Sequence, residues 1–146
     1  MTDLLLGQVL SYSGDPFRDG LGAARHLRHG AVAIETGKIA AVGEAADLRA
    51  RYPQARLHDH GSRLISAGFI DAHVHYPQTA IIASWGKRLI DWLNTYTFPE
   101  ECRFVESAHA ERIARAFFDE FFRNGTTTAV AYCSVHKTSA DAFFAE

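Results

Sequence analysis

The pattern of apolar and polar positions predicts a strand-rich first part of the chain. Apolar residues at 4–12 predict a strand that ends in a turn. Two further apolar runs, 31–35 and 38–43, predict a hairpin, because Gly37 between them can adopt the positive φ that a tight turn needs. The other elements predicted in this part are a polar loop at 18–30, a short helix at 45–52 with Leu48 facing inward, and a polar strand or connector at 56–62.

The second part of the chain alternates strands with helices. An apolar run at 64–75 predicts a buried strand. A broad face of phenylalanines predicts a helix that begins at Ser107 and ends at Asn124 and Gly125. The remaining predicted elements are a helical segment at 89–93, a strand at 126–135 and a helix that begins after Thr138 or Ser139. A strand, helix, strand order is typical of a parallel sheet covered by helices, so the chain is assigned to the α/β class.

The run at 64–75 ends in two histidines. Successive side chains of a strand point to opposite faces, so Asp71, His73 and His75 should share one face. Imidazole is a common metal ligand, and two imidazoles placed side by side can hold one ion. The sequence therefore predicts a metal site at His73 and His75.

A second His-x-His pattern in the chain has a different setting. His58 and His60 lie among charged and small residues, with no apolar strand before them, and are predicted to be solvated. His26 and His29 are expected to be solvent-exposed in the loop at 18–30. His109 is expected on a helix surface.

The composition of the chain indicates a folded protein and gives no sign of a nucleic-acid or membrane partner. The chain has 146 residues, of which 47% are hydrophobic and 12% aromatic, enough for a packed core. Its formal net charge of −2 gives no electrostatic reason to expect a nucleic-acid or membrane partner. The two cysteines, Cys102 and Cys133, form no metal-binding or disulfide pattern, which fits a cytoplasmic location.

Several motifs resemble a known family. The segment Gly68-Phe69-Ile70-Asp71-Ala72-His73-Val74-His75 resembles the first barrel strand of the metal-dependent amidohydrolases. Tyr76-Pro77-Gln78-Thr79 and the stretch from Trp92 to Glu101 resemble, more narrowly, the guanine deaminases. One departure is Ala67, where the family usually has proline. The resemblance covers only the front part of such an enzyme.

The resemblance implies a fold and an activity. It implies that residues 1–63 form part of a small β-sandwich and that 64–146 form the first units of a TIM (β/α)8 barrel, which is truncated after its second strand. The implied activity is zinc-dependent hydrolysis of guanine to xanthine and ammonia by an enzyme that is commonly a homodimer.

The resemblance also implies roles for individual residues. His73 and His75 would bind zinc, and no general acid or base is assigned within the 146 residues. Substrate contacts are expected from His75, Tyr76, Pro77, Gln78, Trp92 and Leu93. For Trp92, helix packing is weighed equally with substrate contact.

Three readings remain open from the sequence. The chain is expected to be an N-terminal fragment of a guanine deaminase that is inactive alone. The first alternative is an amidohydrolase that acts on another aminopurine or on a cyclic amide. The second is a non-catalytic remnant or interaction module.

Overall fold

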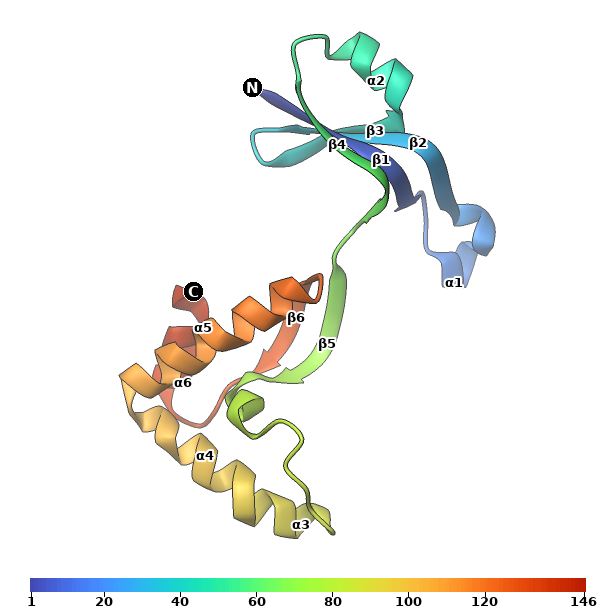
Figure 1. The fold of residues 1–146 in the computed structure, drawn as a ribbon. Helices are drawn as coiled ribbons and strands as arrows, with labels where there is room; N and C mark the ends of the chain where they lie inside the picture. Colours follow the sequence, from blue (N-terminus) through green and yellow to red (C-terminus); the bar gives the residue numbers. More distant parts are fainter. The chain divides into compact units, whose positions relative to one another are not determined.

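The computed structural model describes residues 1–146, which form two compact units, Met1–Ala67 and Gly68–Glu146 (Figure 1). The first unit is built on a four-stranded sheet with strand order β3-β2-β1-β4. Its elements are β1 (Thr2–Tyr12), α1 (Pro16–Asp19), a 3-10 turn (Leu21–Ala23), β2 (Ala24–Glu35), β3 (Lys38–Glu44), α2 (Ala45–Arg51) and β4 (Arg56–Ser66).

Alternating apolar residues explain how the first unit is held together. Leu4 and Leu6 of β1 are buried together with Ala31 and Ala33 of β2, and Leu48 of α2 closes this core from one side. The predicted hairpin is confirmed, because Thr36 and Gly37 both have positive φ in the turn between β2 and β3. The helix with Leu48 inward is also confirmed.

Two predictions for the first unit are wrong. The stretch at 18–30 is not one loop, since β2 begins at Ala24 and pairs with β1 as far as Tyr12. Backbone hydrogen bonds to β1 fix this strand, while its polar side chains face solvent. His58 is not simply solvated, because its Nε2 lies 2.7 Å from the Asp3 carboxylate. Arg56 Nε also donates to Asp3, and these hydrogen bonds, the Arg56 one foremost, lower the pKa of that carboxyl group.

The second unit is a parallel strand, helix, strand arrangement (Figure 1). Strands β5 and β6 pair in parallel, as predicted, and α5 connects them. The elements are β5 (Phe69–His75), a 3-10 segment (Tyr76–Ile81), α3 (Leu89–Trp92), a π-helical turn (Leu93–Thr97), α4 (Phe98–Cys102), a 3-10 turn (Arg103–Val105), α5 (Ser107–Arg123), β6 (Thr126–Tyr132) and α6 (Lys137–Ala145).

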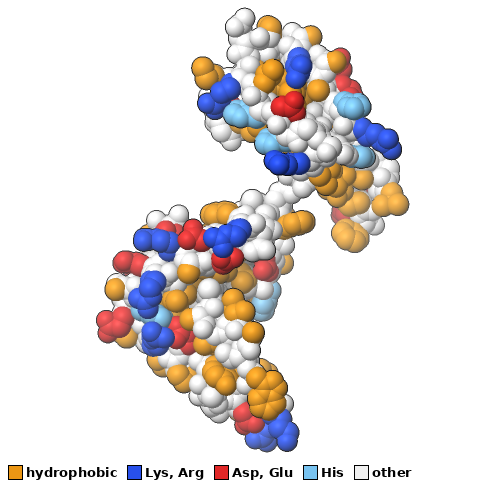
Figure 2. Space-filling model, viewed as in Figure 1, with side chains coloured by type: hydrophobic (Ala, Val, Ile, Leu, Met, Phe, Trp, Pro, Cys, Tyr) orange, Lys and Arg blue, Asp and Glu red, His pale blue; other side chains and the backbone are white.

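The predicted strand at 64–75 proves to be two strands that belong to different units. Leu64, Ile65 and Ser66 end β4 and pair with β1, and β5 begins only at Phe69. The apolar run is continuous in sequence, so its pattern does not mark this break. Nor is β5 buried, since 68% of Phe69 and 72% of Ile70 are exposed. Figure 2 shows hydrophobic side chains on the surface of this unit among charged ones. With β6 as its one neighbouring strand, β5 has one edge that pairs with no other strand.

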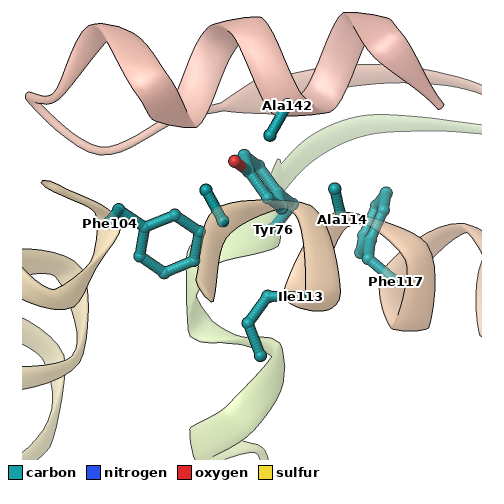
Figure 3. Packing of buried hydrophobic residues seen from close by; sticks show 7 residues of the cluster. Tyr76, Phe104, Ile113, Ala114, Phe117 and Ala142 are labelled. Atoms are coloured by element: carbon teal, nitrogen blue, oxygen red, sulfur yellow. The ribbon is translucent and has the colours of Figure 1, made fainter. Parts of the chain in front are cut away.

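The core of the second unit surrounds Tyr76, which is fully buried directly after β5 (Figure 3). The ring meets Phe104 edge-on, with a centroid separation of 5.5 Å. Helices α5 and α6 enclose it through Ile113, Ala114 and Ala142. The predicted phenylalanine face is confirmed in part, because Phe117 is buried in this cluster whereas Phe122 is exposed.

A short hydrogen-bond network ties Tyr76 to α6 and to the segment after β6. Its hydroxyl donates to the carbonyl oxygen of Ser139 at 2.5 Å and lies 2.9 Å from Ser139 Oγ. The backbone N–H of Ser134 donates to the same Oγ. Burial raises the pKa of both the Tyr76 hydroxyl and the Cys133 thiol, so both groups favour their neutral forms. The network joins the segment after β5, the segment after β6 and α6.

The substitution Tyr76→Phe should destabilise the protein by about 1–3 kcal/mol, because it removes the buried hydroxyl that contacts the Ser139 carbonyl oxygen and Oγ. Urea unfolding followed by near-ultraviolet circular dichroism measures this change. Tyr96→Phe is the matched control, since Tyr96 is half-buried in the same unit and its hydroxyl makes no hydrogen bond within the chain. Equal stability of the two variants would contradict an anchoring role for the Tyr76 hydroxyl.

Candidate functional site

The two histidines at the end of β5 lie side by side. The Nε2 atoms of His73 and His75 are 3.2 Å apart, and both side chains are exposed. Their ring centroids are 5.2 Å apart, with 52° between the ring planes. The predicted placement of both rings on one face of the strand is therefore confirmed.

Tyr132, which the sequence reasoning missed, holds these rings from the neighbouring strand. It pairs in register with His75, and its ring stacks on the His75 ring at 4.7 Å with 11° between the planes. It also lies 4.7 Å from the His73 ring in a tilted arrangement. The parallel register of β5 and β6 would have indicated this contact, because it places the last residues of the two strands together.

Asp71 supports the histidine pair through the backbone. Its carboxylate accepts a hydrogen bond from the backbone N–H of His73 at 3.0 Å. This contact stiffens the strand at the residue where its pairing with β6 becomes irregular, between Asp71 and Val74. The carboxylate therefore has a structural partner within the strand.

The spacing of the two imidazoles fits a single metal ion. Zinc lies about 2.0–2.1 Å from a ligating imidazole nitrogen in a tetrahedral site, so two such nitrogens are roughly 3.3–3.4 Å apart. The observed 3.2 Å is close to this value. The chain supplies no fuller set, since no group of three or more His, Cys, Asp or Glu side chains is placed to hold a metal.

A cleft of about 570 Å³ lies beside the histidines. Asp71, His73 and His75 form one part of its wall, and Gln78 and Trp92 form another. The half-buried Gln78 amide donates from Nε2 to the Glu101 carboxylate at 3.2 Å. The cleft thus places an amide, an indole ring and two imidazoles around one space.

Three residues predicted to contact substrate lie elsewhere. Tyr76 and Pro77 are fully buried and do not line the cleft, because their side chains are packed in the interior of the second unit. Leu93 is half-buried in the π-helical turn and is also absent from the cleft wall. Periodicity could not show this, since the 3-10 segment directly after β5 turns Tyr76 into the core.

His109 was predicted on a helix surface and is instead 6% exposed. Its Nε2 lies 2.7 Å from Glu100 Oε1, and Glu100 is equally buried. Arg112 Nη2 lies 2.7 Å from His109 Nδ1. The prediction failed because the partner that makes burial of this imidazole favourable comes from α4, nine residues earlier in the chain.

Trp92 faces the cleft and also makes a contact within the protein. It lines the cleft, and its indole N–H donates to the Ser84 carbonyl oxygen at 2.9 Å. A Cβ added at Gly86 would lie 2.5 Å from the Trp92 Cβ, so the loop before α3 can approach this closely only with glycine there. Ala83 in the same loop has a φ of 63°, which is unusual for alanine. Trp92 therefore fastens the loop that borders the cleft.

The substitution Trp92→Phe should loosen this loop, because it keeps an aromatic ring but removes the N–H donor. One hydrogen bond contributes about 0.5–1.5 kcal/mol, so trypsin should cut after Lys87 and Arg88 roughly 2- to 10-fold faster. A digestion time course followed by mass spectrometry measures the rates, with cleavage after Lys38 as the internal reference. Trp85→Phe is the matched control, because Trp85 is 76% exposed in the same loop. Equal rates in the two variants would show that the Trp92 N–H does not hold the loop.

Comparison with known proteins places the chain in a family. The model described as "Amidohydrolase family" matches residues 64–146, and the one described as "Imidazolonepropionase-like composite domain, bacteria" matches residues 30–55. Guanine deaminase from Escherichia coli is 37% identical over 123 residues, which are 84% of this chain and 28% of that protein. The chain thus spans less than a third of this relative.

Solved structures agree with the sequence match. Guanine deaminase from Bradyrhizobium japonicum superposes with a TM-score of 0.93 at 28% identity, over 99% of this chain and 32% of that one. Guanine deaminase from C. acetobutylicum, solved with guanine bound in its active site, gives a TM-score of 0.83 at 25% identity, over 99% of this chain and 33% of that one. The amidohydrolase model matches more than half of the residues of this chain, so the chain belongs to the amidohydrolase family.

Proposed function

We propose that the chain supplies the first metal-ligand pair and part of the substrate cleft of a zinc-dependent guanine deaminase. The observation that carries this proposal is the 3.2 Å separation of His73 and His75 beside a cleft that Gln78 also lines. The similarity to guanine deaminases supports guanine as the substrate. Zinc, when bound there, would supply hydroxide at neutral pH, because it lowers the pKa of bound water to about 7.

The chain's own residues would bind and orient the purine. The Gln78 amide offers both a donor and an acceptor to the edge of a planar heterocycle. Trp92 and the half-buried Ile81 supply apolar surface to the same cleft, which suits the faces of a purine ring. We assign no general acid or base among the 146 residues. The Asp71 carboxylate accepts a hydrogen bond from the His73 backbone N–H, and we assign it a structural role.

The proposal extends to the fold of the whole enzyme. The β5, α5 and β6 arrangement would be the opening unit of a TIM barrel, whose active sites lie at the C-terminal ends of the strands. His75 and Tyr132 are the last residues of β5 and β6, where such a site is expected. The 146-residue protein alone would not deaminate guanine, because a catalytic zinc needs about three protein ligands.

A cytoplasmic homodimer is proposed on the family resemblance. No helix in the structure combines the length and apolar character that crossing a lipid bilayer requires.

Zinc binding to the 146-residue protein tests the metal part of the proposal. Isothermal titration should show one zinc ion bound per chain, and the double substitution His73→Ala/His75→Ala should abolish this binding. The matched control is His58→Ala/His60→Ala, which removes the other His-x-His pair and should leave the zinc stoichiometry unchanged. Zinc binding that survives loss of His73 and His75, or no zinc binding at all, would contradict the proposed site.

The activity part needs a separate measurement. Xanthine formation from guanine, with zinc added, should not exceed that of the His73→Ala/His75→Ala variant. Turnover above this level would show that the protein completes a catalytic site by itself, contrary to the proposal. Guanine should nonetheless perturb the NMR side-chain amide signals of Gln78 in the zinc-loaded protein, because this amide lines the cleft.

A further inference from the structure

A buried polar network fastens α4 to α5. Glu100 Oε1 accepts a hydrogen bond from His109 Nε2 at 2.7 Å, and Oε2 accepts one from Arg103 Nη1 at 2.6 Å. Arg112 Nη2 donates to His109 Nδ1 at 2.7 Å. Glu100 and His109 are each 6% exposed, so the contact between them is shielded from water, whereas Arg103 and Arg112 are exposed.

The hydrogen-bond partners of His109 determine which of its ring nitrogens carries the proton. A guanidinium group can only donate, so Nδ1 must be unprotonated in order to accept from Arg112. The single ring proton then lies on Nε2 and is donated to Glu100. The Phe104 ring lies nearly perpendicular to the imidazole, with a centroid separation of 5.0 Å. Helix α4, which has only five residues, is thereby held in one position against the longer α5.

The fixed position of α4 places the Glu101 carboxylate beside the Gln78 amide. Glu101 follows the buried Glu100 directly, is half-buried, and reaches Gln78 Nε2 at 3.2 Å. An ionised carboxylate can only accept hydrogen bonds, so it binds the NH2 end of the amide and not the oxygen end. Gln78 then has its carbonyl oxygen and one N–H left for other partners, at the wall of the cleft.

We infer that Glu101 is a positioning residue that orients the Gln78 amide, and that the Glu100–His109 pair holds Glu101 in place for this task. The oriented amide presents a hydrogen-bond acceptor to the cleft, which selects planar heterocycles that carry ring N–H or amino donors at their edge. Purines with an amino or lactam N–H belong to this class. The link to purines rests on the proposed function, whereas the orientation of the amide does not.

The orientation can be measured by NMR on the ¹⁵N-labelled 146-residue protein without any ligand. The Gln78 side-chain signals are assigned by their loss in Gln78→Ala. In the unsubstituted protein this amide should be ordered, with a high heteronuclear NOE. Glu101→Ala should make the amide mobile, whereas Glu101→Gln should keep it partly ordered because its carbonyl oxygen still accepts. Glu106→Ala is the matched control, since Glu106 is exposed and its carboxylate has no partner in the chain.

A second variant tests the anchoring of α4. His109→Ala should release the Gln78 amide although Glu101 is still present, and circular dichroism establishes whether that variant folds. If it does not fold, Glu101→Ala still decides the main inference. An amide equally ordered in Glu101→Ala, Glu106→Ala and the unsubstituted protein would overturn it.

Titration with guanine in the presence of zinc separates this inference from the proposed function. Guanine should bind the Glu101→Ala variant about tenfold more weakly than the Glu106→Ala control, because a Gln78 amide without Glu101 must be ordered when guanine binds, at a cost of about one hydrogen bond. Equal affinities would overturn the selecting role of Glu101. If guanine perturbs neither protein while the amide is ordered as described, the proposed function fails and the orientation of Gln78 by Glu101 stands.

Discussion

The burial of Tyr76 is the constraint on which the candidate site depends. His75 is exposed and the next residue is completely buried, so the chain must turn into the core at that point. The turn ends β5 with His75 as its last residue and leaves the two imidazoles at the strand's end. It also directs the following 3-10 segment along α5, which sets the position of Gln78. A loss of packing around Tyr76 would therefore displace the histidines and the amide together.

Local patterns in the sequence predicted the parts of the site that depend on neighbouring residues. Strand periodicity of two was sufficient to place His73 and His75 on one face, because the geometry of an extended backbone alone decides this. The parallel pairing of β5 with β6 followed from the order of strand and helix signals. The helix from Ser107 to Arg123 could likewise be predicted from its apolar face and from the glycine after its end.

The features that the sequence did not predict depend on contacts between residues far apart in the chain, which no local pattern encodes. Tyr132 meets the histidines across 57 residues or more of sequence, and Glu101 meets Gln78 across 23. His109 has the position of a surface residue until Glu100 is known to be its partner. The break between Leu64–Ser66 and β5 was missed for a related reason. An apolar run looks the same whether it pairs with one sheet or two. The division becomes visible only in the pairing of Leu64, Ile65 and Ser66 with β1.

The polar groups around the cleft differ in how completely they are satisfied within the chain. The Asp71 carboxylate accepts a hydrogen bond from the His73 backbone N–H, and the Trp92 indole donates one to the Ser84 carbonyl oxygen. The NH2 end of the Gln78 amide donates one to Glu101. Each of these contacts uses one donor or acceptor and fixes the orientation of the group that carries it. The two Nε2 atoms of His73 and His75 have only each other, in an exposed position. Side chains that are already oriented by hydrogen bonds lose less entropy when a ligand binds. Ligand binding is therefore favoured at the groups that still lack a hydrogen-bond partner within the chain. Those places are the imidazole pair and the free end of the Gln78 amide, which is where the proposed metal and purine would meet.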